Sequence, residues 1–190
     1  CISRDITEQA IAEEKIWHNA HHDLLTGLPN RRFFLDRLDQ EIKHAKRHGK
    51  PISLLFMDLD GFKQVNDSLG HEAGDRILSD VAERLADCVR ANDTVARLGG
   101  DEFTVMLTGA EQRQDVEHVA QAIIDTLAMP FHIGQQRIQI SVSIGVAFYP
   151  KAASTPDSLL EAADKAMYKA KKAGSNQMCF QDEVNHTGAS

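Results

Sequence analysis

Long hydrophobic runs are absent from this chain of 190 residues. The longest, residues 52–57, has the length of a strand and contains Ser53, whereas a bilayer-spanning helix needs about 18 apolar residues. Nothing near the start of the given sequence resembles a signal peptide, because charged side chains interrupt any apolar core there: Arg4, Asp5, Glu8, Glu13 and Glu14. We therefore expect a cytoplasmic location without membrane contact.

Cysteine is scarce as well. Cys1, Cys88 and Cys179 are odd in number, far apart and outside any CxxC pair. This pattern argues against a disulfide scaffold or a zinc site and fits a reducing compartment. The histidines at 21–22 and at 71 also lack the spacing of zinc ligands.

Positive charge is in deficit, because 21 Lys and Arg stand against 28 Asp and Glu, for a net charge of −7. This balance argues against binding duplex nucleic acid through bulk charge, and we expect no nucleic-acid partner. It does not argue against a single nucleotide, which needs only a few local cations. With 42% hydrophobic residues the chain can still bury a core, and its length fits one domain plus an appendage.

Capping and turn signals divide the chain into interleaved helices and strands. We predict helices at 5–22 (a thin amphipathic connector or coiled-coil stalk), from Asn30 to Gly49, and at 62–68, 72–88, about 116–127 and 156–173. Predicted strands are 52–58, 94–98, 103–107, 137–140, 142–149 and 178–180. The strands at 94–98 and 103–107 flank a Gly-containing turn and should form a hairpin. The pattern favours a mixed sheet faced by helices over a purely parallel one.

Acidic residues gather where two predicted strands turn. Asp58 ends one strand and Asp60 follows it, while Asp101 and Glu102 lie at the tip of the predicted hairpin. Carboxylates are costly to cluster unless a cation binds between them, and oxygen-only ligands suit magnesium held together with a substrate phosphate. Alternatively, these acids only solvate and cap their turns. The residues by themselves leave both interpretations open.

A calcium loop is excluded at residues 58–61, although Asp58-Leu59-Asp60-Gly61 resembles the start of an EF-hand. Phe62 stands where a third oxygen ligand is required, and the required glycine is misplaced.

Five sequence blocks carry a family resemblance. In chain order they are DLLTGLPNR at 23–31, DLDGFKQVND at 58–67, GHEAGD at 70–75, LGGDEF at 98–103 and ADKAMYKAK at 163–171. Together they resemble the GGDEF domain of diguanylate cyclases over about residues 23–181, and five ordered blocks are far more specific than one GGDEF string. We therefore expect a connector or signalling helix at 1–22, the domain at 23–181, and a tail or linker at 182–190.

The resemblance implies a fold and a catalytic set. The fold would be α+β, with a palm-like, mixed but mainly antiparallel central sheet wrapped by helices, as in nucleotidyl cyclases. Asp58, Asp101 and the carbonyl of Leu59 resemble the ligands of one or two Mg²⁺ ions, with Mn²⁺ as an alternative metal. Glu102 resembles the acid beside the ribose hydroxyl that loses its proton.

The resemblance also assigns substrate-binding residues. Asn66 and Asp75 resemble the pair that recognises the guanine edge, where a carboxylate accepts from N–H groups and an amide both donates and accepts. Lys63 and Lys171 resemble phosphate-binding cations; without the resemblance they would be taken as solvated surface lysines. The remaining residues expected at the substrate are Phe62, His71, Gly99 and Gly100, of which the glycines allow close approach of the nucleotide to the hairpin backbone.

The implied reaction needs two copies of the chain. Two GTP molecules, one per protomer, are placed head to tail, and each 3′-hydroxyl attacks the α-phosphate of the other. Cyclic di-GMP, a bacterial second messenger, and two pyrophosphates are formed. A twofold homodimer is therefore expected.

A second site is implied by Arg90 and Asp93, which form an RxxD sequence separated from Gly99 by five residues. This spacing resembles the inhibitory site of the family, where cyclic di-GMP binds as a feedback inhibitor. An RxxD sequence by itself is more often a solvated charge pair. We expect Arg97, in contrast, to form a structural ion pair.

One position departs from the family pattern. Where the family usually has Gly-Arg-Asn after the helix, this chain has Gly174-Ser175-Asn176. Loss of that cation should weaken GTP binding or slow turnover, with Lys172 or Lys169 as candidates for compensation.

The alternatives to an active cyclase are a non-catalytic cyclic di-GMP receptor that uses Arg90 and Asp93, and a GTP-sensing regulatory module.

Neighbouring domains are expected on both sides. The start of the chain, residues 4–8, resembles the segment that follows PAS sensor domains, so an upstream sensor is predicted. A downstream cyclic di-GMP phosphodiesterase (EAL) domain is left open.

Overall fold

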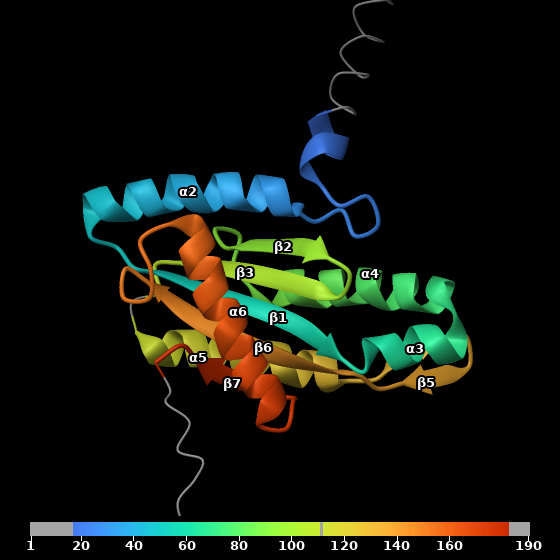
Figure 1. Cartoon of the computed structure of the whole chain (residues 1–190). Coiled ribbons are helices and arrows are strands. Elements are labelled where there is room, and N and C mark those ends of the chain that lie inside the picture. The colour runs from blue at the N-terminus through green and yellow to red at the C-terminus, as the bar shows by residue number, and fades with distance from the viewer. Residues whose placement is uncertain (1–16, 111, 183–190) are drawn as a thin grey trace, which may run out of the picture.

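Strand β1 (Ile52–Asp60) forms the centre of the fold in the computed structural model, which describes residues 17–110 and 112–182 (Figure 1). The other strands are β2 (Thr94–Gly99), β3 (Glu102–Thr108), β4 (Phe131–Ile133), β5 (Gln136–Ile138), β6 (Ser141–Tyr149) and β7 (Met178–Phe180). The helices are α2 (Arg31–His48), α3 (Phe62–Leu69), α4 (His71–Cys88), α5 (Arg113–Ala128) and α6 (Pro156–Lys172). Of the predicted connector at 5–22, residues 5–16 lie outside the described residues.

The main sheet has the strand order β2-β3-β1-β6-β7. β1 pairs antiparallel with both β3 and β6, β2 pairs antiparallel with β3, and β7 lies parallel to β6. The predicted α+β fold with a mainly antiparallel central sheet is thereby confirmed, and so is the hairpin formed by β2 and β3.

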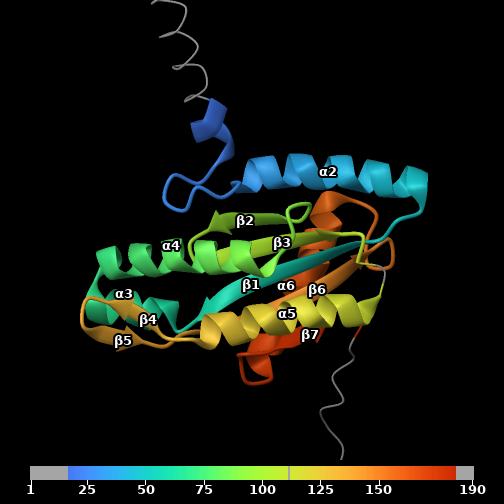
Figure 2. The same ribbon diagram turned by 180° about the vertical axis from the view of Figure 1, so that it is seen from behind.

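Helices cover both faces of this sheet (Figures 1 and 2). Because side chains alternate along a strand, Leu54 and Phe56 of β1 pack with α2 and α6, while Leu55 and Met57 pack with α3, α4 and α5 on the opposite face. β1 is thus buried on both faces, which explains its continuous apolar run.

α6 lies especially close to the sheet, because β6 carries Gly145 where the two elements cross. A Cβ atom there would collide with the backbone of Ala163 and of Met167. The bare glycine backbone therefore lets α6 lie against β6, which sets the position of the lysines near its C-terminal end.

Local signals account for the helix ends. The Asn30 side chain accepts a hydrogen bond from Phe33 N at 3.0 Å and caps α2, and Gly49 ends that helix with φ of 67°. Thr155 and Ser158 form a capping box at the start of α6. No helix among residues 17–110 and 112–182 is both long and apolar enough to cross a membrane.

One strand was missed, and the ends of two predicted strands differ from those in the structure. The predicted strand at 137–140 is β5 at 136–138, and it pairs with β4, which was not predicted, in a separate two-stranded hairpin. These strands have three residues each, too few to show an alternating pattern. β1 also continues two residues beyond its predicted end at Asp58, because Leu59 and Asp60 pair with Val142 and Ser141 of β6.

Candidate active site

The two acidic turns meet at one end of the sheet. Asp58 on β1 is the register partner of Glu102 on β3, and Leu59 N donates to the carbonyl of Asp101 at 3.3 Å. Asp58 continues the alternation of Leu54 and Phe56, so it lies on the sheet face that α2 and α6 cover. Strand pairing therefore brings Asp58, Asp101 and Glu102 together.

Burial and mutual repulsion shift the ionisation of these acids. Burial raises the pKa of Asp58, and the nearby carboxylates of Asp101 and Asp60 raise it further, against the opposing effect of Lys171. Burial also raises the pKa of Glu102, and Asp58 is the strongest of the neighbouring charges that add to the shift. The site is thus a half-buried concentration of negative charge that favours a bound cation.

Lys171 supplies one cation from α6. Its Nζ donates to Asp58 Oδ1 at 2.6 Å, and both side chains are partly buried. The family resemblance predicted a phosphate ligand at Lys171, whereas here its ammonium group contacts a predicted metal ligand. From this position beside Asp58, the Lys171 ammonium group can contact either the Asp58 carboxylate or a phosphate bound next to it.

The donor set fits a metal that is held together with a substrate. Among residues 17–110 and 112–182, no three His, Cys, Asp or Glu side chains are arranged to hold a metal ion on their own. Two carboxylates, Asp58 and Asp101, and the Leu59 carbonyl are the oxygen atoms that the family resemblance would assign as ligands. Mg²⁺ is typically bound by one or two carboxylates and completes its coordination with water and substrate phosphates.

Asp60 has a structural role instead. Its carboxylate accepts hydrogen bonds from Ser141 Oγ at 3.0 Å, from Ser143 Oγ at 2.8 Å and from Asn176 N at 3.1 Å. The last of these bonds holds the turn at Ser175 and Asn176, which have φ of 60° and 49°. The strand-end pattern grouped Asp60 with the other acids, but its carboxylate oxygens already accept hydrogen bonds from β6 and from this turn.

The two predicted guanine-binding residues lie on the α3–α4 helix pair, which is joined at Gly70. Asp75 has an exposed side chain. The Asn66 side-chain oxygen is buried and has no hydrogen-bond partner. Because an unpaired buried acceptor is costly, this amide is a candidate ligand-binding group.

The other predicted substrate residues lie on this helix pair and in the hairpin turn. Phe62 is buried, whereas Lys63 and His71 are exposed. Gly99 and Gly100 have φ of 145° and 54°, and a Cβ on either would meet nothing within 4 Å. The turn conformation alone therefore explains both glycines, and the open space beside them is compatible with a ligand.

The predicted feedback residues lie at the opposite end of β3. Asp93 Oδ1 accepts from Thr108 N at 3.2 Å, and Asp93 Oδ2 accepts from Arg90 N at 3.0 Å. Thr108 lies six positions after Glu102 along β3, which corresponds to about 20 Å. Arg90 and Asp93 line a cavity of about 170 Å³ that is distinct from the acidic site.

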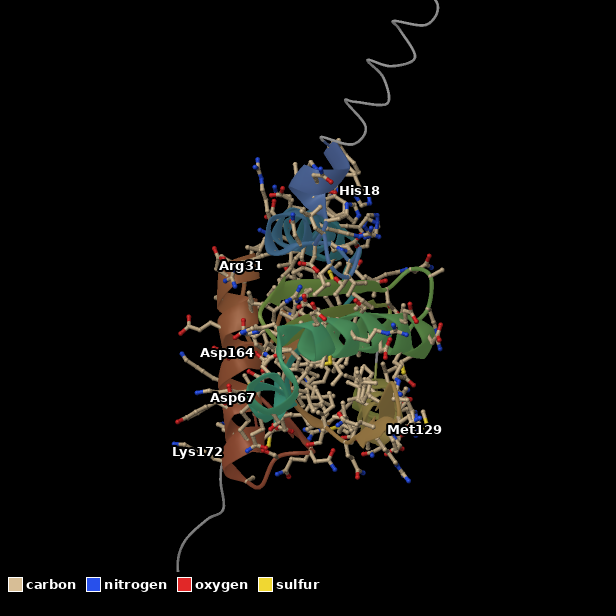
Figure 3. The ribbon with its side chains drawn as sticks, turned by 90° about the vertical axis from the view of Figure 1, so that its right-hand side faces the viewer. His18, Arg31, Asp67, Met129, Asp164 and Lys172 are labelled. Carbon is tan, nitrogen blue, oxygen red and sulfur yellow. The ribbon has the colours of Figure 1, made fainter. Side chains whose placement is uncertain are left out.

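Two charged residues near Glu102 were not predicted. Asp164 of α6 raises the pKa of Glu102 and Arg31 of α2 lowers it. Figure 3 shows both on the edge of the molecule along which α6 runs. Each lies within one of the five sequence blocks, but only packing of α2 and α6 on the same sheet face brings them near Glu102.

The expected structural ion pair of Arg97 is confirmed. Its Nη1 donates to Asp23 Oδ1 at 2.9 Å and to Oδ2 at 3.0 Å, and its Nη2 donates to the carbonyl of Gly100 at 2.8 Å. Arg97 therefore connects the loop at residues 23–29 with the glycine turn of the hairpin.

The two lysines proposed to compensate for the missing arginine at Ser175 have different surroundings. Lys172 places its Nζ 4.6 Å from the centre of the Tyr168 ring. Lys169 lines a separate groove together with Lys151 and Lys165. Compensation for the missing arginine stays a prediction.

Residues 20–177 match the family model described as "Diguanylate cyclase, GGDEF domain". Among curated proteins, the chain is 47% identical over 174 residues to the bifunctional diguanylate cyclase/cyclic di-GMP phosphodiesterase MucR of Pseudomonas aeruginosa, covering 92% of this chain and 25% of MucR. It is 45% identical over 156 residues to the diguanylate cyclase TpbB of the same organism, covering 82% of this chain and 36% of TpbB. The chain thus spans about a quarter to a third of the length of these relatives.

Solved structures show the same fold. The isolated GGDEF domain of TpbB superposes with a TM-score of 0.83 and 42% identity, covering 85% of this chain and 95% of that domain. The coiled coil and GGDEF domain of DgcB from Caulobacter crescentus, in complex with c-di-GMP, gives a TM-score of 0.86 at 27% identity, covering 94% of each chain.

Proposed function

Because this chain belongs to the diguanylate cyclase GGDEF domain family, we propose that it condenses two GTP molecules into cyclic di-GMP and two pyrophosphates. The observation that carries the proposal is the register pairing of Asp58 with Glu102, beside Asp101 and within reach of Lys171. This pairing produces an acidic site at the end of the sheet that is suited to a metal-bound triphosphate.

Each side chain then has a role in the reaction. Asn66 and Asp75 bind the guanine edge, and Lys63 and Lys171 bind phosphate oxygens. Asp58, Asp101 and the Leu59 carbonyl would hold Mg²⁺ or Mn²⁺. When bound, the metal neutralises charge on the phosphoryl oxygens and lowers the pKa of the attacking hydroxyl.

Glu102 is the proposed proton acceptor. Burial and the charges of Asp58, Asp164 and Asp101 raise its pKa, which makes its carboxylate a stronger base. The 3′-oxygen of one GTP forms a bond to the α-phosphorus of the other, its proton passes to Glu102, and pyrophosphate leaves. The remaining 3′-hydroxyl then attacks the remaining α-phosphate in the same way, a second pyrophosphate leaves, and the ring of cyclic di-GMP is closed.

The reaction requires a homodimer. One chain carries one guanine-binding pair and one acidic set, so two chains must face each other to bring each hydroxyl to the opposite α-phosphate. Product would bind at Arg90 and Asp93, beside the Thr108 end of β3 and away from Glu102, and inhibit by holding the protomers apart. The cavity beside these two residues supports this assignment.

Residues 23–181 would act as the cyclase domain of a longer cytoplasmic protein. Residues 1–22 would transmit the state of a PAS-like sensor to the cyclase domain. Residues 182–190 would be a tail, or a linker to an EAL domain if the protein has one. Bifunctional MucR, which is much longer than this chain, is compatible with such an arrangement.

A catalytically weak receptor is the second candidate. Ser175 stands where the family usually has a phosphate-binding arginine, and Lys171 is bonded to a metal ligand. In that case the chain would bind cyclic di-GMP through Arg90 and Asp93, or sense GTP, without turnover.

Incubation with GTP and Mg²⁺ at concentrations that favour the dimer tests the proposal. We expect cyclic di-GMP and pyrophosphate in a ratio of one to two, and Glu102→Gln should abolish both products. Glu83→Ala, at an exposed position on α4, is the control that should retain activity. Binding of cyclic di-GMP without any turnover of GTP would instead support the receptor.

A further inference from the structure

Gly74 lies inside α4, where glycine is a poor helix former. It is buried, and its backbone does not adopt the left-handed conformation that favours glycine elsewhere in this chain. Neither a turn nor a helix end explains the residue. The reason must be the space that a side chain at this position would occupy.

That space is taken by Asn66 of the neighbouring helix α3. A Cβ atom at Gly74 would overlap with Asn66 Oδ1 and would lie 3.0 Å from Asn66 Cγ. Phe62, one helical turn before Asn66, is the next neighbour, with its Cζ at 3.2 Å. The overlap with the Asn66 amide is by far the more severe.

Packing, rather than hydrogen bonding, therefore sets the position of the amide. The backbone of Asn66 is anchored at the helix junction, where its carbonyl accepts from Gly70 N at 2.9 Å. Its side-chain oxygen, in contrast, is buried without a hydrogen-bond partner. The bare backbone of Gly74 is what this oxygen rests against.

We propose that Gly74 is a positioning residue for base recognition, because its missing side chain lets the Asn66 amide lie in the orientation that binds guanine. This inference rests on the proposed function. The amide is the end of a flexible side chain, so an alanine at 74 would turn it aside at little cost to the fold. The loss would fall on nucleotide binding.

Three variants test this assignment: Gly74→Ala, Asn66→Ala and the double variant Asn66→Ala/Gly74→Ala. Binding is measured calorimetrically with 3′-deoxy-GTP and Mg²⁺, since this nucleotide lacks the attacking hydroxyl and cannot be condensed. We expect Gly74→Ala to weaken binding about tenfold, as loss of a hydrogen bond to a buried group does. The double variant should match Asn66→Ala within about twofold, because alanine at 74 has no amide left to displace.

Further readouts separate positioning from a structural role. With Gly74→Ala, KM for GTP should rise while kcat at saturation changes little, and binding of 3′-deoxy-ATP should not fall. A purely structural role would instead lower the melting temperature, reduce the affinity for both nucleotides, and leave an added loss in the double variant.

Two results would overturn the inference. If Gly74→Ala binds 3′-deoxy-GTP as the unaltered chain does, or if the double variant binds clearly more weakly than Asn66→Ala, Gly74 does not act through the amide. If the unaltered chain itself binds no 3′-deoxy-GTP, the proposed function fails together with the inference.

Discussion

Asp58 and Asp101 are the residues on which the metal assignment depends. Each would contribute one carboxylate to the same ion, so Asp58→Ala and Asp101→Ala should each lower turnover by about 100-fold or more. The measurement is the rate of cyclic di-GMP formation at saturating Mg²⁺, with Glu83→Ala as the exposed control. Near-normal rates in both variants would show that the metal is held elsewhere.

Asp75 decides the choice of base in the proposed site. Its carboxylate accepts from guanine N–H groups that adenine does not present in the same place. Asp75→Ala should therefore lose most of its preference for GTP over ATP, since the discriminating partner is gone. The ratio of the two nucleotide affinities measures this effect, and an unchanged ratio would count against the role of Asp75.

At the scale of elements, Arg97 at the end of β2 ties the loop after residue 22 to the hairpin turn. Besides its bonds to Asp23 and Gly100, its backbone N–H donates to Pro29 O at 3.0 Å. Burial raises the pKa of Asp23, but hydrogen bonds from Thr26 and Arg97 outweigh this effect and hold the pKa below its ordinary value. The pair therefore stabilises the fold while Asp23 is ionised.

The pH dependence of this contribution has a definite sign. Because the pKa of Asp23 is lower in the folded chain, the stabilisation is complete above the unfolded value of about 3.9 and is lost as pH falls through the folded pKa. Arg97→Ala should lower the free energy of unfolding by about 2 kcal/mol at pH 7. This difference should shrink towards pH 3, which urea denaturation at both pH values measures.

Lys43→Ala is the matched control for that experiment. Lys43 pairs with Asp39 on the surface of α2, where the lysine is largely in water and the aspartate is partly exposed, and such pairs contribute little. The control should be nearly neutral at both pH values. An equal loss at pH 7 and pH 3 for Arg97→Ala would mean that packing of the arginine, rather than the ion pair, stabilises this junction.

At the scale of the whole molecule, the proposed reaction gives each chain half of the reacting groups. The rate per chain should therefore rise in proportion to protein concentration where the chain is mostly monomeric, and level off once dimers dominate. Initial rates measured beside sedimentation at the same concentrations test this dependence. A constant rate per chain in the monomeric range would contradict catalysis by a dimer.

In the proposed function, feedback would also be a property of the assembled molecule. Arg90 neighbours Asp93, which is bonded to Thr108 at the end of β3 opposite Glu102, so Arg90→Ala should leave the initial rate near that of the unaltered chain. Because arginine can donate two hydrogen bonds to a guanine edge, its loss should let cyclic di-GMP accumulate further before the reaction stalls. Progress curves with added product measure this, and unchanged inhibition would place the feedback elsewhere.

Local chemistry was sufficient for much of the fold. The Asn30 cap, the Gly49 stop and the apolar run of β1 are each determined by neighbouring residues, and the structure confirms them. The three-residue strands β4 and β5 were missed or displaced because so short a segment has no readable period. The five motif blocks also predicted which acids would gather, since they reproduce the order of a known family.

The sequence by itself determined the family, the sheet class and the acids at the strand ends, because these depend on residue type and spacing along the chain. Only the tertiary structure decided that Lys171 reaches Asp58, that Asp60 is bonded to β6, and that Gly74 lies against the Asn66 amide. These contacts join residues on different elements, and their distances depend on how β1 pairs with β6 and on how closely α6 and α4 pack. No periodicity along the chain encodes that packing, so it becomes visible only when the elements have been assembled.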